Sequence, residues 1–314
     1  MTKKKIDLYL RNKYKFNKNY PIKKLTTIGL GGIADYVVYP LNIRELVDLI
    51  LYCRTNKIRY ELLGNGSNVL YSDRHFKGII ISINYLTKLY KKVDELYVMC
   101  GVKLPYLSYY AYQHSYVNFE SFSLIPGSVG ASVSINAGAY GRCIGDNIKS
   151  VVVLDKNNKI KVLKKEEIIF KYRGSSLMEN NYIILFACFN LEEGNKLEIK
   201  SKMDLYSKLR TESQPLYERN FGSLFKNHET KKAYKIIKEC QLEEFTYKGV
   251  KLSKKHLNFL QISTNNSAKD VLYFIEKLRE KVYNKVGLVL DNEVILVNWR
   301  EKDVKRIKRK FKWH

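Results

Sequence analysis

The stretches Leu63-Gly-Asn-Gly-Ser-Asn68 and Ile125-Pro-Gly-Ser-Val-Gly130 are the most informative part of this sequence. Each turn combines glycine with serine or asparagine, residue types that let backbone N–H groups point together into a concave anion site. Two related segments, Thr27-Ile-Gly-Leu-Gly-Gly32 and Ile135-Asn-Ala-Gly-Ala-Tyr140, lie in the same half of the chain. Several such turns in one region indicate that a large, phosphate-bearing ligand such as a dinucleotide is held at more than one point.

The residues around the first turn predict a β-α-β-like unit. Asn42-Ile-Arg-Glu45 has the pattern of a capping box and predicts an amphipathic helix that extends to about Cys53. A short strand is expected over 59–63, and the apolar run 78–84 has the length of a buried strand. The turn that begins at Gly64 therefore follows the end of a strand, which is where ligands bind in α/β sheets.

The rest of the chain predicts further strands and helices in a second α+β subdomain and beyond. We expect strands over 96–100, 150–155, 182–186, 288–290 and 294–297, helices over 104–114, 197–210 and 267–287, a hairpin turn at 155–159 and a linker at 192–196. The last of these helices has Ser267 and Asp270 as its start signal and ends near Gly287.

The composition is that of a globular, strongly basic protein. A length of 314 residues, 45% of them hydrophobic, predicts a sizeable core and excludes a disordered chain. The formal net charge of +25 makes nucleic acid or an anionic membrane a candidate partner. However, basic residues are dispersed along the whole chain, which favours a solvated surface that attracts acidic small molecules. The basic tail 299–314 has apolar residues on one helical face and is interpreted as a capping helix.

Several classes of protein are disfavoured by the sequence. The 5 cysteines are far apart and form no CxxC pair, and the 5 histidines show no ligand spacing, so neither a disulfide framework nor a metal site is predicted. The start of the chain lacks the apolar region of a signal peptide, and no stretch approaches the roughly 18 apolar residues of a membrane span. We therefore expect a cytoplasmic protein.

Three polar residues beside apolar segments are candidates for chemistry. Arg173 carries a planar guanidinium suited to a carboxylate, and Ser223 lies beside Gly222, between two phenylalanines, where a hydroxyl can donate a proton. Glu293 precedes an apolar run, where a carboxylate either pairs with a cation or takes part in a reaction. Taken singly, each has a plainer interpretation: a surface arginine, a serine in a turn and an ion-paired glutamate.

The order of the motifs carries more information than any one of them. The chain resembles the UDP-N-acetylenolpyruvoylglucosamine reductases over residues 20–297, on motifs that occur in the family's order: Thr27–Gly32 with Asp35, Gly64–Asn68, Ile125–Gly130, Asn136–Gly141, Tyr172-Arg173, Gly222–Asn227, and Lys255-His256 with Asn258-Phe259. The resemblance implies an α+β fold, in which an FAD-binding region of two α+β subdomains of the vanillyl-alcohol-oxidase (PCMH-like) type precedes a smaller C-terminal α+β substrate domain. On this basis we place the first subdomain at 1–85, the second at 86–196 and the substrate domain at 197–298.

The resemblance also implies an activity. In this family NADPH reduces FAD, and UDP-N-acetylglucosamine enolpyruvate is then reduced to UDP-N-acetylmuramate for peptidoglycan. By this likeness Arg173 stabilises the charge that develops on the substrate carboxylate, Glu293 assists there and Ser223 delivers a proton to carbon. The residues implied to bind FAD are Gly64, Asn65, Gly66, Ser67, Asn68, Pro126, Gly127, Ser128, Val129, Gly130, Asn136, Ala137 and Gly138. Those implied to bind substrate are Tyr172, Arg210, Gln214, Lys226 and Asn227.

The chain departs from the family pattern at a few positions. Ala131, His228 and Lys251 stand where relatives carry glycine, proline and glutamine, which bears on flavin and substrate affinity but leaves the catalytic residues intact. No long tyrosine-bearing insertion lies between residues 182 and 210, so the chain resembles the shorter subtype, and we expect a monomer. Two rivals stay open: a flavin oxidase or dehydrogenase with another substrate, and a basic nucleic-acid-binding protein, although no recognition helix or RNA-binding aromatic motif is present.

Overall fold

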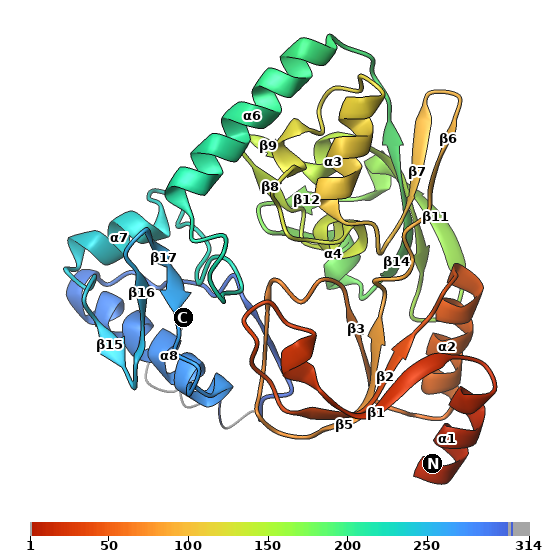
Figure 1. Cartoon of the computed structure of the whole chain (residues 1–314), viewed down its shortest axis with the longest axis horizontal. Helices are drawn as coiled ribbons and strands as arrows, with labels where there is room; N and C mark the ends of the chain where they lie inside the picture. Colours follow the sequence, from red (N-terminus) through yellow and green to blue (C-terminus); the bar gives the residue numbers. More distant parts are fainter. Residues whose placement is uncertain (1, 301–302, 304–314) are drawn as a thin grey trace. The chain divides into compact units, whose positions relative to one another are not determined.

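The computed structural model of the chain describes residues 2–300 and 303. These residues form two compact units, each assembled from several stretches of sequence (Figure 1). Unit 1 takes in the described residues of Met1–Lys18, Tyr36–Asn65 and Gly78–Glu212, and unit 2 those of Asn19–Asp35, Gly66–Lys77 and Ser213–His314. The capping helix predicted for 299–314 falls almost entirely outside the described residues, and the three-domain division stays a prediction.

Two β-sheets lie mostly within unit 1, although three of their strands begin or end in stretches assigned to unit 2. A four-stranded sheet has the order β1-β2-β5-β3 and a five-stranded sheet the order β11-β10-β14-β7-β6. Their strands are β1 (Lys15–Pro21), β2 (Ile33–Tyr39), β3 (Tyr60–Leu63), β5 (Phe76–Ser82), β6 (Leu89–Lys92), β7 (Glu95–Met99), β10 (Ile148–Leu154), β11 (Ile160–Lys164) and β14 (Ile183–Asn190). Strands β3 and β5 are parallel, as expected for strands joined by a crossover connection.

Helices and short strands complete unit 1. They are α1 (Lys3–Arg11), α2 (Ile43–Thr55), α3 (Leu104–Gln113), α4 (Val129–Ser134), α5 (Ser176–Glu179), α6 (Lys196–Ser213), β8 (Gly138–Ala139), β9 (Arg142–Cys143), β12 (Phe170–Lys171) and β13 (Gly174–Ser175). Figure 1 shows α1 and α2 beside the four-stranded sheet, and α3 and α4 beside the five-stranded one. One continuous cluster of buried apolar side chains joins these helices to both sheets.

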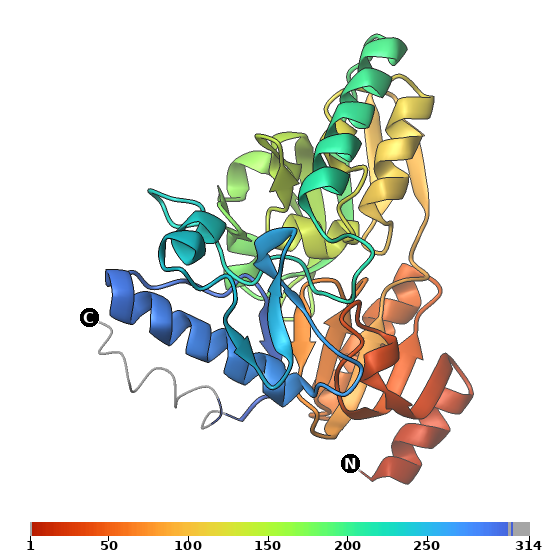
Figure 2. The same cartoon turned by 60° about the vertical axis from the view of Figure 1, so that its left-hand side comes forward.

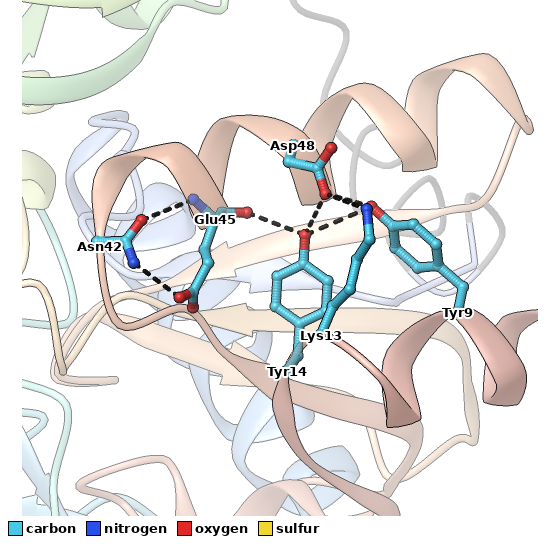
Figure 3. A network of polar contacts seen from close by, with 6 residues as sticks. All are labelled: Tyr9, Lys13, Tyr14, Asn42, Glu45 and Asp48. Atoms are coloured by element: carbon cyan, nitrogen blue, oxygen red, sulfur yellow. Dashed lines mark hydrogen bonds and ion pairs between the residues drawn. The ribbon is translucent and has the colours of Figure 1, made fainter.

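The start of helix α2 confirms Asn42 as the predicted N-cap, but the reciprocal bond of a capping box is shifted by one residue. Asn42 Oδ1 accepts the backbone N–H of Glu45 at 2.9 Å, and the Glu45 carboxylate accepts the N–H of Leu41 at 2.8 Å. Figure 3 shows how the helix continues into a polar network. Asp48 accepts the hydroxyls of Tyr9 at 2.6 Å and Tyr14 at 2.7 Å, which ties α2 to the first residues of the chain.

The network makes a prediction about stability. The hydrogen bonds from Tyr9 and Tyr14 hold the pKa of Asp48 below its usual value. A carboxylate with a lowered folded-state pKa stabilises the fold above the unfolded pKa and loses that effect as the pH falls. Because Asp48 is half-exposed, Asp48→Asn should lower the free energy of unfolding by only about 1 kcal/mol near neutral pH, and by less at about pH 3, where an aspartate of the unfolded chain is mostly protonated.

Denaturant unfolding at the two pH values checks this prediction. Asp204→Asn is the matched control, because Asp204 forms an exposed helical ion pair with Lys200 and makes the same change in charge. An equal loss of stability by Asp48→Asn at both pH values would mean that the carboxylate charge is irrelevant to the network.

Unit 2 is built around one long helix and a β-hairpin. Its elements are a single 3-10 turn (Ile22–Lys24), β4 (Val69–Tyr71), α7 (Ala233–Glu239), β15 (Thr246–Tyr247), β16 (Val250–Ser253), β17 (His256–Gln261), α8 (Ala268–Val286) and β18 (Ile295–Val297). Figure 2 shows α8 beside the β16–β17 hairpin, and buried side chains of both contribute to a second apolar cluster. Strands β18 and β4 pair in parallel, so residues 295–297 lie beside residues 69–71.

The boundaries of α8 are those predicted from the sequence. Ser267 accepts the N–H of Asp270 at its N-cap, and Gly287 closes the helix in the left-handed conformation, φ 69°. Asp73 adds a second cap, because its carboxylate accepts the N–H groups of Ala268 and Lys269 at 3.0 Å.

The strand expected over 288–290 is wrong. These residues lie outside the helices and strands. The carbonyl of Leu290 accepts a hydrogen bond from Arg279 Nε at 2.7 Å, so a side chain of α8 supplies the partner that a neighbouring strand would have given.

Candidate active site

Two of the predicted glycine-rich turns lie against each other in unit 1. Asn65 Nδ2 donates to the carbonyl of Pro126 at 2.8 Å. A Cβ atom on Gly64 would lie 2.3 Å from Ser128 Oγ, so the absence of a side chain allows this approach. Ser128 Oγ is buried and has no hydrogen-bond partner among the described residues. A buried hydroxyl without a partner, at the meeting point of two turns, fits a ligand with polar atoms such as the phosphates of FAD.

The amide groups of the second turn are partly used by the fold. The N–H of Val129 donates to Val102 and that of Gly130 to Cys100, both at 2.8 Å. A Cβ on Gly130 would lie 2.7 Å from Cys100 Cβ, so this glycine lets α4 pack closely on the chain that follows β7. The predicted contribution of Val129 and Gly130 to FAD binding would therefore use atoms other than these two N–H groups.

The segment Asn136–Gly138 is joined to the segment that carries Arg173. Asn136 Oδ1 accepts the N–H of Gly145 at 3.1 Å, and its Nδ2 donates to the carbonyl of Lys171 at 3.0 Å. Arg173 Nη1 donates to the carbonyl of Gly138 at 3.3 Å. The side-chain amide of Asn136 thus joins the segments that contain Gly145 and Lys171, a role that the sequence motif alone did not indicate.

Arg173 occupies an unusual backbone conformation. It lies between β12 and β13 with φ 53°, in the left-handed region that few residues other than glycine adopt. Its guanidinium lies 5.3 Å from the centre of the Tyr172 ring, and the Tyr172 side chain is exposed. Such strained positions cluster at functional sites, because the surrounding structure must hold them in place.

Arg210 on α6 is the second guanidinium of this region. Its Nε is buried without a hydrogen-bond partner among the described residues. Burial lowers the pKa of Arg210; Tyr140 opposes this effect and the positive charge of Arg173 adds to it. Tyr140 stacks on Tyr206 with ring centres 4.6 Å apart and donates its hydroxyl to the Tyr206 carbonyl at 3.1 Å. Two neighbouring guanidiniums of unit 1 are thus suited to an anionic ligand.

In unit 2, Ser223 and Glu293 lie on neighbouring antiparallel segments. The N–H of Glu293 donates to the carbonyl of Leu224 at 2.9 Å, and the N–H of Lys226 to that of Asp291 at 2.8 Å. Phe225 and Asn292 form the bridge between these two bonds. Residues separated by 70 positions in the sequence (223 and 293) therefore come together at one end of this short ladder, and both side chains are half-buried.

A third segment, Gly66–Asn68, completes this arrangement. Asn68 Nδ2 donates to the carbonyl of Glu293 at 3.2 Å, and the Asn68 carbonyl accepts the N–H of Ile295 at 3.0 Å. A Cβ on Gly222, which has φ 85°, would lie 3.9 Å from the carbonyl oxygen of Ser67. Residues of the first glycine-rich turn thus lie beside the Ser223 and Glu293 segments.

Two structural residues of this arrangement were missed as site residues. Thr27 Oγ1 donates to the carbonyl of Asn220 at 2.7 Å, and its N–H donates to that of Gly66 at 3.1 Å. Arg219 donates to the carbonyls of Ile28 and Gly29 at 3.1 and 2.9 Å. The sequence signal for these contacts was the glycine-rich motif that begins at Thr27. This motif is hydrogen-bonded to residues 219 and 220, which precede Ser223.

The residues predicted to bind substrate in unit 2 have different surroundings. Gln214 is half-buried, and its Oε1 has no hydrogen-bond partner among the described residues. Lys226 is half-buried. Asn227 is exposed and accepts the N–H of Ala233 at 3.0 Å, at the start of α7. Gln214 therefore has a buried oxygen to which a ligand could donate a hydrogen bond, whereas the side-chain oxygen of Asn227 already accepts the N–H of Ala233.

Two further features are absent from the described part of the chain. There, no three His, Cys, Asp or Glu side chains are grouped as a metal site would require. Within the same residues no helix has the length and apolar character needed to cross a membrane.

Comparison with known proteins gives a consistent result over nearly the whole chain. Residues 34–164 match the model of the FAD binding domain, and residues 214–297 match that of the UDP-N-acetylenolpyruvoylglucosamine reductase C-terminal domain. The chain is 37% identical over 279 residues to the UDP-N-acetylenolpyruvoylglucosamine reductase of Caldanaerobacter subterraneus subsp. tengcongensis. The aligned residues cover 89% of this chain and 92% of that protein. It is 36% identical over 294 residues to the enzyme of Clostridium novyi, over 94% and 95% of the two chains.

A solved structure agrees with these sequence matches. The crystal structure of the reductase from Thermus caldophilus superposes with a TM-score of 0.75 at 27% identity, over 90% of this chain and 98% of that one. The α+β fold class expected from the sequence, with an FAD-binding region before a smaller C-terminal domain, is confirmed. Strand β14 and helix α6 are joined directly by residues 191–195, with no inserted loop. This chain belongs to the UDP-N-acetylenolpyruvoylglucosamine reductase family.

Proposed function

We propose that this chain is an FAD-dependent reductase that converts UDP-N-acetylglucosamine enolpyruvate to UDP-N-acetylmuramate with NADPH, and that Arg173, Ser223 and Glu293 are its catalytic residues. Family membership supports the activity. The observation that supports the residue assignment is the short antiparallel ladder that brings the Ser223 and Glu293 segments together beside Asn68.

FAD, when bound, would supply the redox chemistry, which is hydride transfer from NADPH to the enolpyruvyl double bond. The Asn65–Pro126 contact and the buried Ser128 hydroxyl are the features of unit 1 that fit this cofactor. Residues Gly64–Asn68, Pro126–Gly130 and Asn136–Gly138 are proposed to hold it.

The chemistry of the substrate explains the three catalytic residues. A hydride added to the terminal carbon displaces the electron pair of the double bond onto the neighbouring carbon and its carboxylate. Arg173 stabilises this negative charge, which a guanidinium does well where water is excluded. Glu293, carrying or sharing a proton, assists at the same carboxylate, and Ser223 donates the proton that completes the new C–H bond.

The remaining polar residues are assigned to the anionic part of the substrate. Arg210 has a buried Nε without a partner, and Gln214 has a buried Oε1 in the same condition. We assign both, with Lys226, Asn227 and Tyr172, to contacts with the UDP-sugar, and the basic surface to its attraction from solution. A monomeric, cytoplasmic enzyme stays a prediction.

Anaerobic stopped-flow absorbance of the flavin tests the proposed function. NADPH should bleach the flavin band, and UDP-N-acetylglucosamine enolpyruvate added afterwards should restore it. Bleaching without recovery would indicate a flavoprotein with a different electron acceptor. A protein that cannot be loaded with FAD, and that binds DNA or RNA with a steep salt dependence, would support the nucleic-acid alternative.

A further inference from the structure

Helix α8 carries a buried charged pair that the proposed chemistry does not use. The side chains of Glu276 and Arg279 are 11% and 13% exposed, and Arg279 Nη1 lies 3.4 Å from Glu276 Oε2. Charged side chains are rarely buried to this degree without a structural or functional task.

Both side chains contact the segment that leads to Glu293. Gly287 ends α8, and the chain then runs back along the helix: Arg279 Nε donates to the carbonyl of Leu290 at 2.7 Å, and the Asn292 side chain contacts Glu276. Leu290 thus contacts the later of the two helix residues and Asn292 the earlier one, as expected for a segment that runs antiparallel to the helix.

The segment 290–293 is therefore held from two sides. On one side the backbone of Asp291 and Glu293 pairs with that of Leu224 and Lys226, next to Ser223. On the other side α8 supplies Arg279 and Glu276. The position of Glu293 relative to Ser223 thus depends on how firmly α8 holds the residues just before Glu293.

The contact between Glu276 and Asn292 is incomplete in one respect. Glu276 Oε1 and Asn292 Oδ1 are both buried acceptors, and within the described residues neither has a hydrogen-bond partner. A hydrogen bond joins the two side chains, so a proton on Glu276 would add a donor to this pair and remove the charge that burial disfavours.

The electrostatics around Glu276 make such a proton available near neutral pH. Burial raises the pKa of Glu276 to about 7, and Arg279 and the hydrogen bond to Asn292 oppose this rise without cancelling it. Strands β15 and β16 also pack on α8, but among the described residues Arg279 is the one charged group that acts on this carboxyl.

We propose that Glu276, with Arg279, is a positioning residue for Glu293: it holds the segment 290–293 against α8, and does so more firmly when its carboxyl group is protonated. The consequence for the reaction rests on the function proposed above, whereas the structural effect can be measured without it.

Hydrogen exchange of the Glu293 backbone amide tests the structural effect. Wild-type protein and Glu276→Gln are compared about one unit below and about one unit above the pKa of Glu276. Glutamine keeps a donor toward Asn292 at every pH and so imitates the protonated acid. Exchange should be equal at the lower pH and roughly fivefold faster in the wild type at the higher pH, as expected for one lost buried hydrogen bond. Glu244→Gln, an exposed carboxylate of unit 2, should follow the wild type throughout.

Two further readouts separate positioning from a general loss of stability. One component of the infrared C=O band of neutral carboxylic acids should decrease strongly in the wild type across this pH range, and this component should be missing from Glu276→Gln at both pH values. In the loaded enzyme, flavin reoxidation by the enolpyruvyl sugar should slow about fivefold with rising pH in the wild type and not in Glu276→Gln, while reduction by NADPH stays equal in both.

Equal exchange at Glu293 in the wild type and Glu276→Gln at both pH values would overturn the proposal, whatever the activity. If neither protein is reoxidised by the sugar, the proposed function fails, and the exchange ratio still decides whether Glu276 positions the segment. Arg279→Lys keeps the charge but loses the Nε donor to Leu290, and should speed Glu293 exchange at both pH values. Unchanged exchange in that variant would remove Arg279 from the arrangement.

Discussion

Ser223→Ala should leave the reduction of the flavin by NADPH unchanged and slow its reoxidation by the enolpyruvyl sugar roughly 10²- to 10⁴-fold. The hydroxyl is proposed to act in one event, the delivery of a proton to the carbon beside the substrate carboxylate. Loss of a positioned proton donor affects that event and not the transfer of hydride from NADPH. The fold should tolerate the change, because the ladder beside Ser223 is built from the backbone of Leu224, Phe225 and Lys226.

Single-turnover stopped-flow measurements of the two half-reactions check this result. Ser201→Ala, an exposed serine on α6, is the matched control and should behave as the wild type in both. Ser223→Cys retains a weak donor at the same place and should recover part of the rate. Equal slowing of both half-reactions by Ser223→Ala would remove the proton-donor assignment and point to a role in flavin binding.

The elements with strong local signals were those predicted well from the sequence. Helices α2 and α8 carry their own start signals in Asn42 and Ser267, and α8 also carries its stop signal in Gly287. The hairpin turn after β10 was readable because Asp155 accepts the N–H groups of Asn157 and Lys159. In each case the residues that set the boundary lie within a few positions of it.

Elements that depend on distant partners were missed. Helix α1 was not predicted: its two buried residues, Ile6 and Leu10, have helical spacing, but a helix of 9 residues depends on tertiary packing for its stability. Strand β1 has largely exposed side chains and is defined by its place at the edge of a sheet. The strand wrongly expected over 288–290 has the apolar character of a strand, but its neighbour is a helix whose Arg279 takes up the Leu290 carbonyl. Tertiary contacts decided these cases, and a local pattern does not contain them.

The candidate site shows the same division. The resemblance supplied Ser223 and Glu293, but the short ladder between them involves irregular segments with no strand pattern, so their proximity was not readable from periodicity. The support given by Thr27 and Arg219 comes from hydrogen bonds to backbone carbonyls, which leave no sequence signature in the residues that accept them. Arg173 and Arg210 come near each other only because α6 packs beside the β8–β9 turn, where Tyr206 stacks on Tyr140. This contact is likewise not visible in the sequence pattern.

Gly66→Ala should strongly weaken the binding of FAD. Gly66 has φ 65°, and a Cβ there would lie 2.0 Å from the carbonyl oxygen of Leu25 and 2.9 Å from the Cα of Thr26. Both are backbone atoms, so no change of rotamer relieves the contact, and the turn must move. The movement would break the hydrogen bond from Thr27 to Gly66 and displace Asn68, which holds the Glu293 carbonyl. We expect a loss of about 2–4 kcal/mol in the free energy of unfolding and at least a roughly tenfold weaker affinity for FAD.

Gly249→Ala is the control that separates the effect of the steric clash at Gly66 from the effect of placing alanine at a positive φ. Gly249 has φ 81° with nothing within 4 Å of its Cβ position, so alanine there carries the cost of a left-handed residue, about 1 kcal/mol, and no steric conflict. The two variants are compared by flavin absorbance per protein and by denaturant unfolding. Gly249→Ala should keep its flavin, because β15 and β16, which it joins, contain none of the residues assigned to FAD. If Gly66→Ala binds FAD as tightly as Gly249→Ala does, the first glycine-rich turn tolerates displacement and cannot be a rigid part of the cofactor site. If it loses FAD while Gly249→Ala retains it, the close packing of Gly66 on Leu25 and Thr26 is what keeps the turn in a binding conformation.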